Sequence, residues 1–349
     1  MANIKAFLKN WTLPLSMLAG VVGYFIFVAL PLSAEVHKFT YTAISHYIQP
    51  VLIFSMLFLS FLKVRVHEMK PRKWHFRVLM LQASFFVFFS LLAMSFENNG
   101  LKVLCEGAML AFICPTATAS AVITGRLGGS ISGVVTYLMM CNLMVSIICP
   151  LFLPLVEPQA GISFLPSFLL ILSKVFPLLI CPLLLAIVVR YLMPGVHKKL
   201  MSYTNLSFDI WVVALALAIT VTVRSIVHSS VPWQYLVALA FISGICCLAQ
   251  FWMGRKAGKG NFNKLFHRRR GGVGMNDGED IKITSLNKGD IGNSDSITAG
   301  QAFGQKNTVF AIWLGLVFLD PVTSIVGGFY SVWHNIVNSW QLYKVRNQS

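Results

Sequence analysis

The residues of this sequence whose types could bind a solute gather at two interruptions of apolar segments. At the first, an apolar run that begins at Val103 meets Pro115 and then three hydroxyl side chains, those of Thr116, Thr118 and Ser120. At the second, Gly304 precedes four polar side chains in a row, those of Gln305, Lys306, Asn307 and Thr308. Hydroxyls, amides and an ammonium, together with carbonyls freed by a helix break, could bind an ion or a small polar solute.

The apolar arms beside these interruptions are short. Each has about 11 residues, half of the roughly 20 that a helix needs to cross a bilayer. Backbone groups freed at such a break are tolerated in a membrane only where they face protein or a polar cavity. Paired broken helices in two related halves of a chain are the best sequence indication of a secondary transporter's binding site. The sequence therefore predicts two broken membrane helices around a solute site.

The composition predicts an integral membrane protein. Of the 349 residues, 56% are hydrophobic and 11% are charged, whereas soluble proteins carry about 25% charged residues. The mean hydropathy is +0.71. We predict an all-α protein with ten spans, which are 12–31, 48–62, 78–95, 103–124, 131–155, 164–193, 206–223, 233–253, 298–319 and 322–342. The fourth and ninth spans contain the interruptions.

The net charge of +16 could indicate a nucleic-acid ligand, but its distribution favours a membrane topology. With the N-terminus inside, 23 of the 28 Lys and Arg residues fall in inner segments, and only Lys38, Lys102 and Arg224 fall in outer loops. Cytoplasmic loops of membrane proteins carry such an excess. We therefore expect both termini in the cytoplasm and the protein in the cell's inner (plasma) membrane, with membrane lipids but no nucleic acid as partners.

The ten spans divide into two sets of five. Residues 1–156 would form the first set, 157–253 spans six to eight, and 298–349 spans nine and ten. Because five is odd, the second set runs in the opposite orientation, which is the inverted-repeat arrangement. Residues 254–297 are rich in Gly, Asn, Asp, Ser and Lys, and we expect a flexible basic cytoplasmic insertion there.

Lys306 is the strongest single candidate for a solute-binding residue. A lysine near the middle of a membrane costs at least about 2.5 kcal/mol and should face a cavity, a partner or a substrate anion. The alternative is that the helix begins later and leaves Lys306 at the cytoplasmic interface. The hydroxyls after Pro115 likewise have an alternative, in which they bond only to carbonyls of their own helix.

Other polar residues in the predicted spans suit hydrogen bonds between helices better than ligand binding. They are Gln82, Asn142, His334 and Asn335. Lys174 either reaches an interface or lines a cavity, and Glu106 lies near enough to a span end to be interfacial. The sequence has no catalytic motif and no metal-ligand spacing, so we expect neither an enzyme nor a bound cofactor or metal.

At these positions the chain resembles the bile acid:sodium symporter (BASS) superfamily. The matching stretches are 113–120 in the fourth span, 304–307 in the ninth and 332–335 in the tenth, and the basic loop 63–77 followed by Gln82 also fits. The resemblance covers nearly the whole chain except 254–297. It implies a core domain (spans 3–5 and 8–10) that slides against a panel domain (spans 1, 2, 6 and 7), with the broken helices crossing in the core. It also implies organic anions as substrates, such as bile acids, steroid sulfates, keto acids or pantoate-like compounds, usually driven by sodium.

The sequence departs from the family's sodium pattern. Ala121 follows Ser120 where the family has Asn, Ala302 replaces a glutamate, and Lys306 replaces a sodium-ligating glutamine. Ser120, Asn307 and Gln82 persist. An ammonium repels a sodium ion by roughly 4 kcal/mol at 4 Å with an effective dielectric near 20.

The sequence therefore predicts a secondary active transporter of small organic anions that works by alternating access. In this hypothesis Lys306 replaces the coupling cation, either by exchanging a proton or as a fixed charge that makes transport sodium-independent. Two alternatives stay open: a sodium-coupled bile-acid-type symporter with altered ligands, and a non-transporting sensor or scaffold that uses 254–297 to bind a partner.

Overall fold

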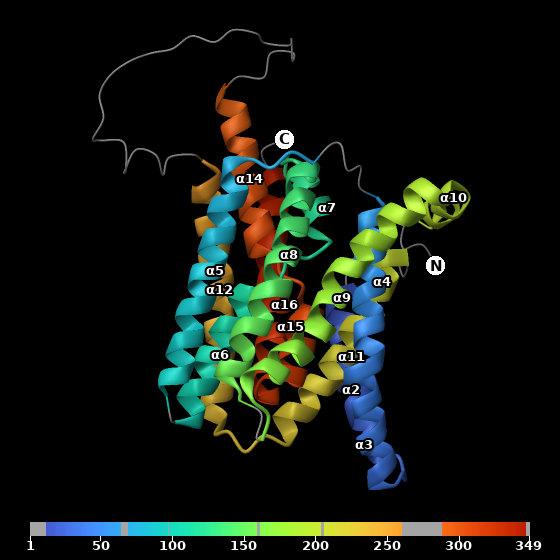
Figure 1. The fold of residues 1–349 in the computed structure, drawn as a ribbon, viewed down its shortest axis with the longest axis vertical. Coiled ribbons are helices and arrows are strands. Elements are labelled where there is room, and N and C mark those ends of the chain that lie inside the picture. Colours follow the sequence, from blue (N-terminus) through green and yellow to red (C-terminus); the bar gives the residue numbers. More distant parts are fainter. Residues whose placement is uncertain are drawn as a thin grey trace.

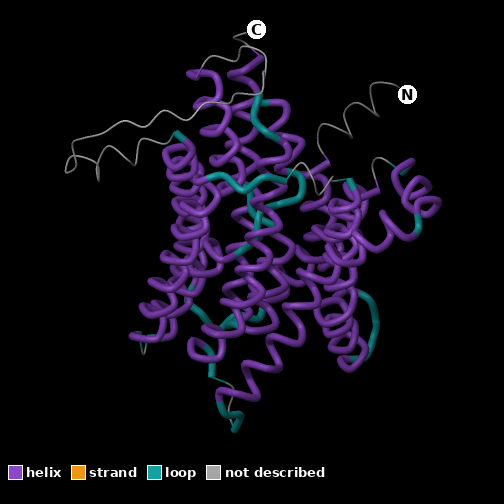
Figure 2. The backbone as a smooth tube through the Cα atoms, turned by 45° about the horizontal axis from the view of Figure 1, so that its top comes forward, coloured by secondary structure: helices purple, strands orange, loops and turns teal. Residues whose placement is uncertain are grey.

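The computed structural model describes residues 12–63, 69–96, 98–158, 161–203, 206–259 and 288–346. Helices joined by loops make up the described chain, in which Figure 2 shows no strand. The only extended pairing among the described residues is one isolated bridge. The first half contains α2 (Thr12–Ala29), α3 (Ala34–Ala43), the π-helix η1 (Ile44–Ile48), α4 (Gln49–Leu62), α5 (Lys73–Ser95), α6 (Asn99–Ile113), α7 (Ser120–Arg126) and α8 (Ile131–Val156). The second half contains α9 (Phe164–Leu192), α10 (Pro194–Ser202), α11 (Leu206–Val227), α12 (Trp233–Gly258), α14 (Lys288–Gly304), α15 (Thr308–Phe318), the 3-10 helix η3 (Pro321–Ser324) and α16 (Ile325–Arg346).

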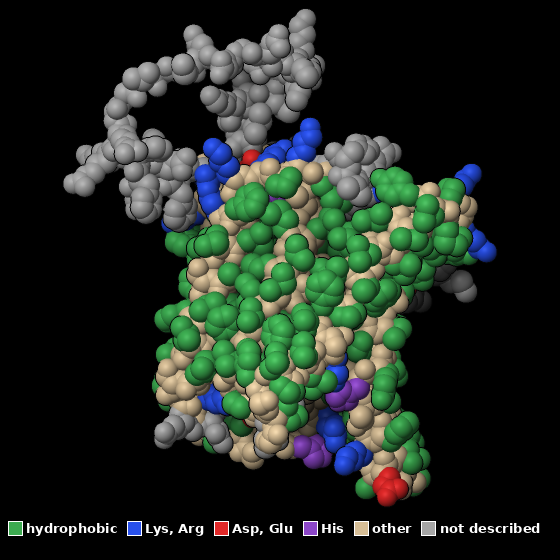
Figure 3. All heavy atoms as spheres, in the orientation of Figure 1, with side chains coloured by type: hydrophobic (Ala, Val, Ile, Leu, Met, Phe, Trp, Pro, Cys, Tyr) green, Lys and Arg blue, Asp and Glu red, His purple; other side chains and the backbone are tan. Residues whose placement is uncertain are grey.

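Six of these helical segments are long and apolar enough to cross a membrane. They are Ala34–Leu62, which runs through α3, η1 and α4, and the helices α5, α8, α9, α11 and α12. Apolar side chains cover the flank of the bundle in Figure 3, while Lys and Arg side chains lie towards its upper and lower ends. The membrane character predicted from composition is therefore confirmed.

The helices pack in two groups that lie side by side in Figure 1. In one group α12 packs on α14, α16 and α6, and α5 packs on α6 and α8. In the other, α11 packs on α2 and α4, and α4 packs on α9. The α8–α9 contact is the most extensive one between the groups.

The closest contact in the first group is that between α12 and α14. Gly254 and Gly258 lie one turn apart on α12, a spacing that lets two membrane helices approach closely. A Cβ atom on Gly254 would lie 2.5 Å from the Ala299 carbonyl oxygen, and one on Gly258 would meet the backbone of Asp295. Only a residue without a side chain fits at these two positions.

This packing corrects the predicted insertion at both ends. Residues 254–258 belong to α12, and α14 begins at Lys288, so the ends of the range 254–297 are helical. Asp295 of α14 also forms an ion pair with Arg72, at 2.5 Å. The rest of the predicted insertion, 260–287, lies outside the described residues.

Candidate functional site

The two predicted interruptions meet inside the bundle. The backbone N–H of Asn307 donates to the Pro115 carbonyl at 2.8 Å, and that of Ala117 donates to the Gln305 carbonyl at 3.0 Å. Between these two bonds, Thr116 and Lys306 lie opposite each other as an antiparallel bridge. The short extended segment between α6 and α7 therefore pairs with the one between α14 and α15.

The first break follows from proline chemistry. A residue before proline is disfavoured in the helical conformation, and Cys114 has φ −53° and ψ 134°. The helix α6 accordingly ends at Ile113. The second break has no proline. It ends at Asn307, whose side chain caps α15 by accepting a hydrogen bond from the Phe310 N–H at 3.2 Å.

The carbonyls at the end of α6 are bonded by side chains from three different elements. An α-helix leaves its last four carbonyls without partners in the helix. Gln250 of α12 donates to the Ala111 carbonyl at 3.1 Å, and Lys306 donates to that of Phe112 at 3.2 Å. Gln82 of α5 donates to the next two carbonyls at 3.0 and 3.2 Å. The C-terminal end of a helix carries partial negative charge, so the Lys306 ammonium stabilises it.

The end of α14 is bonded in the same manner. The Thr116 hydroxyl donates to the Ala302 carbonyl at 2.5 Å, and the Tyr330 hydroxyl donates to the Gly304 carbonyl at 2.8 Å. Gly304 also packs so closely on the Phe251 ring that a side chain there would overlap it. We call the paired segments 114–119 and 305–307 the crossing. It is held by hydrogen bonds that reach from each broken helix to the other.

Lys306 is buried at the crossing, with 1% of its surface exposed. Its ammonium lies 4.9 Å from the centre of the Phe303 ring, and the Phe112 carbonyl is its one hydrogen-bond acceptor among the described residues. No carboxylate in the described part of the chain lies within ion-pair distance of it. An ammonium has three donors and a full charge, so Lys306 keeps unused capacity for an anionic partner.

The other predicted residues of the second interruption lie beside Lys306. Gln305, Asn307 and Thr308 are buried. The Gln305 amide donates to the side chain of Gln301, whose own amide donates to Gln341 at 2.6 Å. Arg255 also donates to Gln341, at 3.1 Å. A buried hydrogen-bonded chain therefore leads from the crossing to the partly exposed Arg255.

The structure separates the predicted hydroxyls after Pro115. Thr116 and Ser120 are fully buried, whereas Thr118 is partly exposed. The Ser120 hydroxyl donates to the Ala117 carbonyl at 2.6 Å, so it bonds within its own segment. Only Thr116 of the three reaches across to the other broken helix.

Gln82 is a fully buried part of the crossing. Its amide oxygen accepts from the Tyr137 hydroxyl at 2.7 Å and from the Cys141 thiol at 3.4 Å. Asn142, the next residue on α8, is 1% exposed, and neither atom of its amide has a hydrogen-bond partner among the described residues. Asn142 is therefore a buried polar group with its bonding capacity free.

The two predicted residues of α16 lie further along the helix than Tyr330. His334 is buried with its ring edge against Tyr330 and its Nδ1 atom without a partner in the described chain. Asn335 donates to the Ser331 carbonyl of its own helix at 2.6 Å. No bond joins either side chain to the two breaks among the described residues.

Sequence reasoning missed four residues that complete the crossing, namely Gln250, Gln301, Tyr330 and Gln341. Gln250 and Gln301 carried a usable signal, since each is an amide inside a predicted apolar span. Tyr330 and Gln341 gave none, because tyrosine is common in membrane helices and Gln341 stands at a span end.

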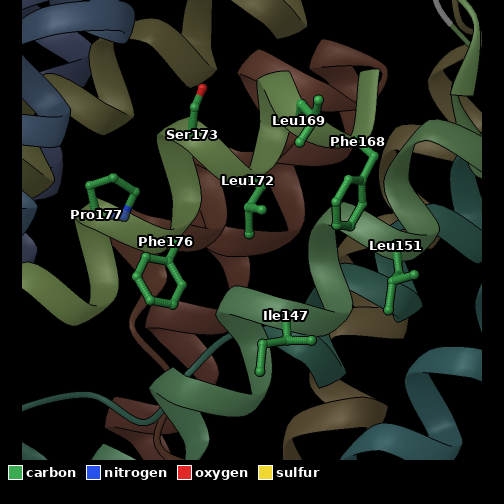
Figure 4. A pocket seen from close by; sticks show the side chains of 8 residues that line it. All are labelled: Ile147, Leu151, Phe168, Leu169, Leu172, Ser173, Phe176 and Pro177. Carbon is green, nitrogen blue, oxygen red and sulfur yellow. The ribbon is translucent and has the colours of Figure 1, made fainter. Parts of the chain in front are cut away.

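An apolar groove lies between α8 and α9, in the flank of the bundle (Figure 4). Its volume is about 550 Å³, and its lining consists of Ile147, Leu151, Phe168, Leu169, Leu172, Ser173, Phe176 and Pro177. None of these side chains is charged, so the groove offers no group that would bind an anion. It is separate in composition from the polar crossing.

The fold and the crossing define a membrane-embedded, all-helical protein with two broken helices paired at a buried lysine. The sequence matches no protein-family model and no curated protein.

Proposed function

We propose that this chain is a secondary transporter of small organic anions and a divergent member of the BASS superfamily. In this proposal ten spans form two inverted repeats of five helices. The broken fourth span is α6–α7 and the broken ninth span is α14–α15. The group with α2, α3–α4, α9 and α11 would be the panel, and the other helices would form the core.

The observation that carries the proposal is the buried ammonium of Lys306 without a carboxylate partner. A charge of this kind inside a membrane protein is expensive unless a counter-charge or ligand compensates it. The Phe112 carbonyl supplies only the partial charge of a helix end. A substrate carboxylate or sulfate would supply the full negative charge and accept the remaining N–H groups.

The bonding at the crossing also favours transport that does not use sodium. Sodium requires several free oxygen ligands. The amide oxygen of Asn307 accepts a backbone bond at 3.2 Å, and that of Gln82 accepts from two side chains. These amide oxygens are already bonded, and the Lys306 ammonium beside them repels a cation. In this proposal Lys306 therefore takes the place of the coupling cation.

The reciprocal pairing of the breaks supports the inverted repeat. Each break donates one backbone N–H to the other and accepts one in return, as two halves related by a two-fold axis would. Of the 28 Lys and Arg residues, 23 fall in segments at the predicted inner side, which supports a cytoplasmic location for that side in the inner (plasma) membrane.

A thermal-unfolding screen of the purified protein tests the proposal. The probes are cholate, a steroid sulfate, a branched keto acid and pantoate, with choline as the cationic control. At least one anion should raise the unfolding temperature of the wild type, and choline should not. The Lys306→Gln variant should lose this response, while Lys198→Gln, which removes an exposed lysine of α10, should keep it.

Two results would contradict the proposal. One is stabilisation of Lys306→Gln equal to that of the wild type by every active anion. The other is loss of all anion responses when residues 260–287 are deleted, because a scaffold that works through that segment would need it and a transporter would not.

A further inference from the structure

Glu106 is a buried acid that the proposed transport site does not use. Its place near a span end predicted an interfacial side chain, but none of its surface is exposed, although it stands only two turns from the start of α6. Neither carboxyl oxygen accepts a hydrogen bond from any described residue. A carboxylate taken out of water without donors is strongly destabilised in its ionised form.

One ammonium is shared between two acids beside it. The Lys102 ammonium, one turn earlier on α6, lies 2.5 Å from Glu157 Oε1 and 3.9 Å from Glu106 Oε1. Glu157 follows the end of α8, and its carboxylate shares the Lys102 ammonium with that of Glu106. The close ion pair therefore belongs to Lys102 and Glu157, and Glu106 is left with the more distant contact.

A third acid adds to the negative charge at this end of the bundle. Asp320 precedes η3, which packs on α6, and it acts electrostatically on Glu106. Its carboxylate accepts from the Val322 N–H at 2.9 Å. Among the described residues, the charged groups that act on Glu106 are thus one ammonium and two carboxylates.

We propose that Glu106 is a proton-binding site at the end of the bundle where α6 begins. In the protonated form its O–H donates to the Glu157 carboxylate, which also pairs with Lys102. The carboxyl–carboxylate pair and the single ammonium then balance to zero charge. Two ionised acids at the same place would leave an uncompensated charge in an apolar surrounding.

The pair beside Glu106 gives the proton a way out. The side chains of Lys102 and Glu157 are 23% and 32% exposed, so both reach the surface at this end of the bundle. Transfer of the proton from Glu106 to Glu157 breaks one O–H bond and forms another, and Glu157 can then release the proton to water. This assignment does not depend on what the chain transports.

Infrared spectroscopy of the purified protein tests the site. A protonated carboxyl group has a C=O stretching band that is separate from carboxylate bands and shifts in D₂O. At neutral pH the wild type should show this band, and raising the pH should remove it. The Glu106→Gln variant, which keeps the shape of the protonated side chain, should lack it.

Glu157→Gln removes the neighbouring carboxylate and leaves the Lys102 ammonium to Glu106 alone. In this variant the band should therefore persist at low pH but disappear at a lower pH than in the wild type. A wild type without the band at neutral pH would overturn the proposal, and this measurement needs no variant to fold. A band that survives in Glu106→Gln and disappears in Glu157→Gln would overturn it as well, since the proton would then belong to Glu157.

Discussion

Thr116 and Lys306 face each other at the crossing. Each side chain donates a hydrogen bond to the carbonyl of the residue four positions before its opposite partner. Thr116 donates to the carbonyl of Ala302, and Lys306 donates to that of Phe112. The two backbone bonds beside them follow the same exchange. The Thr116 hydroxyl and the Lys306 ammonium thus occupy equivalent places. The two breaks differ chemically in that the second one carries a positive charge.

We expect Thr116→Val to destabilise the protein, because valine has a similar shape but cannot donate to the Ala302 carbonyl. A buried acceptor left unsatisfied costs about 1–3 kcal/mol. Thermal unfolding in detergent micelles should show a clear decrease for Thr116→Val and little change for Thr116→Ser. Equal unfolding temperatures for Thr116→Val and Thr116→Ser would mean that the hydrogen bond of the Thr116 hydroxyl does not hold the two broken helices together.

Gln82→Leu should also destabilise the protein, since it removes the donor to two freed carbonyls at the end of α6. The expected loss is about 1–3 kcal/mol for each unsatisfied group, reduced where water enters. Tyr137→Phe is the matched control, because it removes only a donor to the Gln82 oxygen and leaves both carbonyls bonded. A larger loss for Tyr137→Phe than for Gln82→Leu would contradict the role assigned to Gln82.

Gly254→Ala should weaken the packing of α12 on α14. The new Cβ would lie 2.5 Å from a backbone oxygen, and overpacking of this kind typically costs about 1–3 kcal/mol. Gly195→Ala at the start of α10 is the control, because a Cβ there would meet no atom within 4 Å. If the unfolding temperature fell by the same amount in Gly254→Ala and Gly195→Ala, α12 and α14 would not be closely packed at Gly254.

The apolar helices and the two breaks could be predicted from the sequence because each depends on local signals. All ten predicted spans overlap helices, and the breaks lie at Cys114–Ala119 and Gln305–Asn307, where a proline and a run of polar residues indicated them. The partners at the breaks could not be predicted, since Gln250 reaches a carbonyl 139 residues away in the chain. Only tertiary packing brings such groups together.

The start of α14 and the burial of Glu106 show two further limits. Residues 288–297 are mostly polar and small and have no apolar periodicity, so they suggested a loop. Their helix forms beside the glycines of α12, and helices gain most of their stability from such packing. For Glu106, its place near a span end did not reveal that the neighbouring helices cover it completely.

The central claim is that Lys306 takes the place of the coupling cation for an organic anion. It is tested most directly by uptake of the most stabilising anion into proteoliposomes, with sodium chloride or potassium chloride on both sides. We predict equal uptake by the wild type in the two salts and a loss of about tenfold or more in Lys306→Gln, equivalent to about 1.4 kcal/mol. Uptake by the wild type that requires sodium, or full uptake by Lys306→Gln, would contradict the claim.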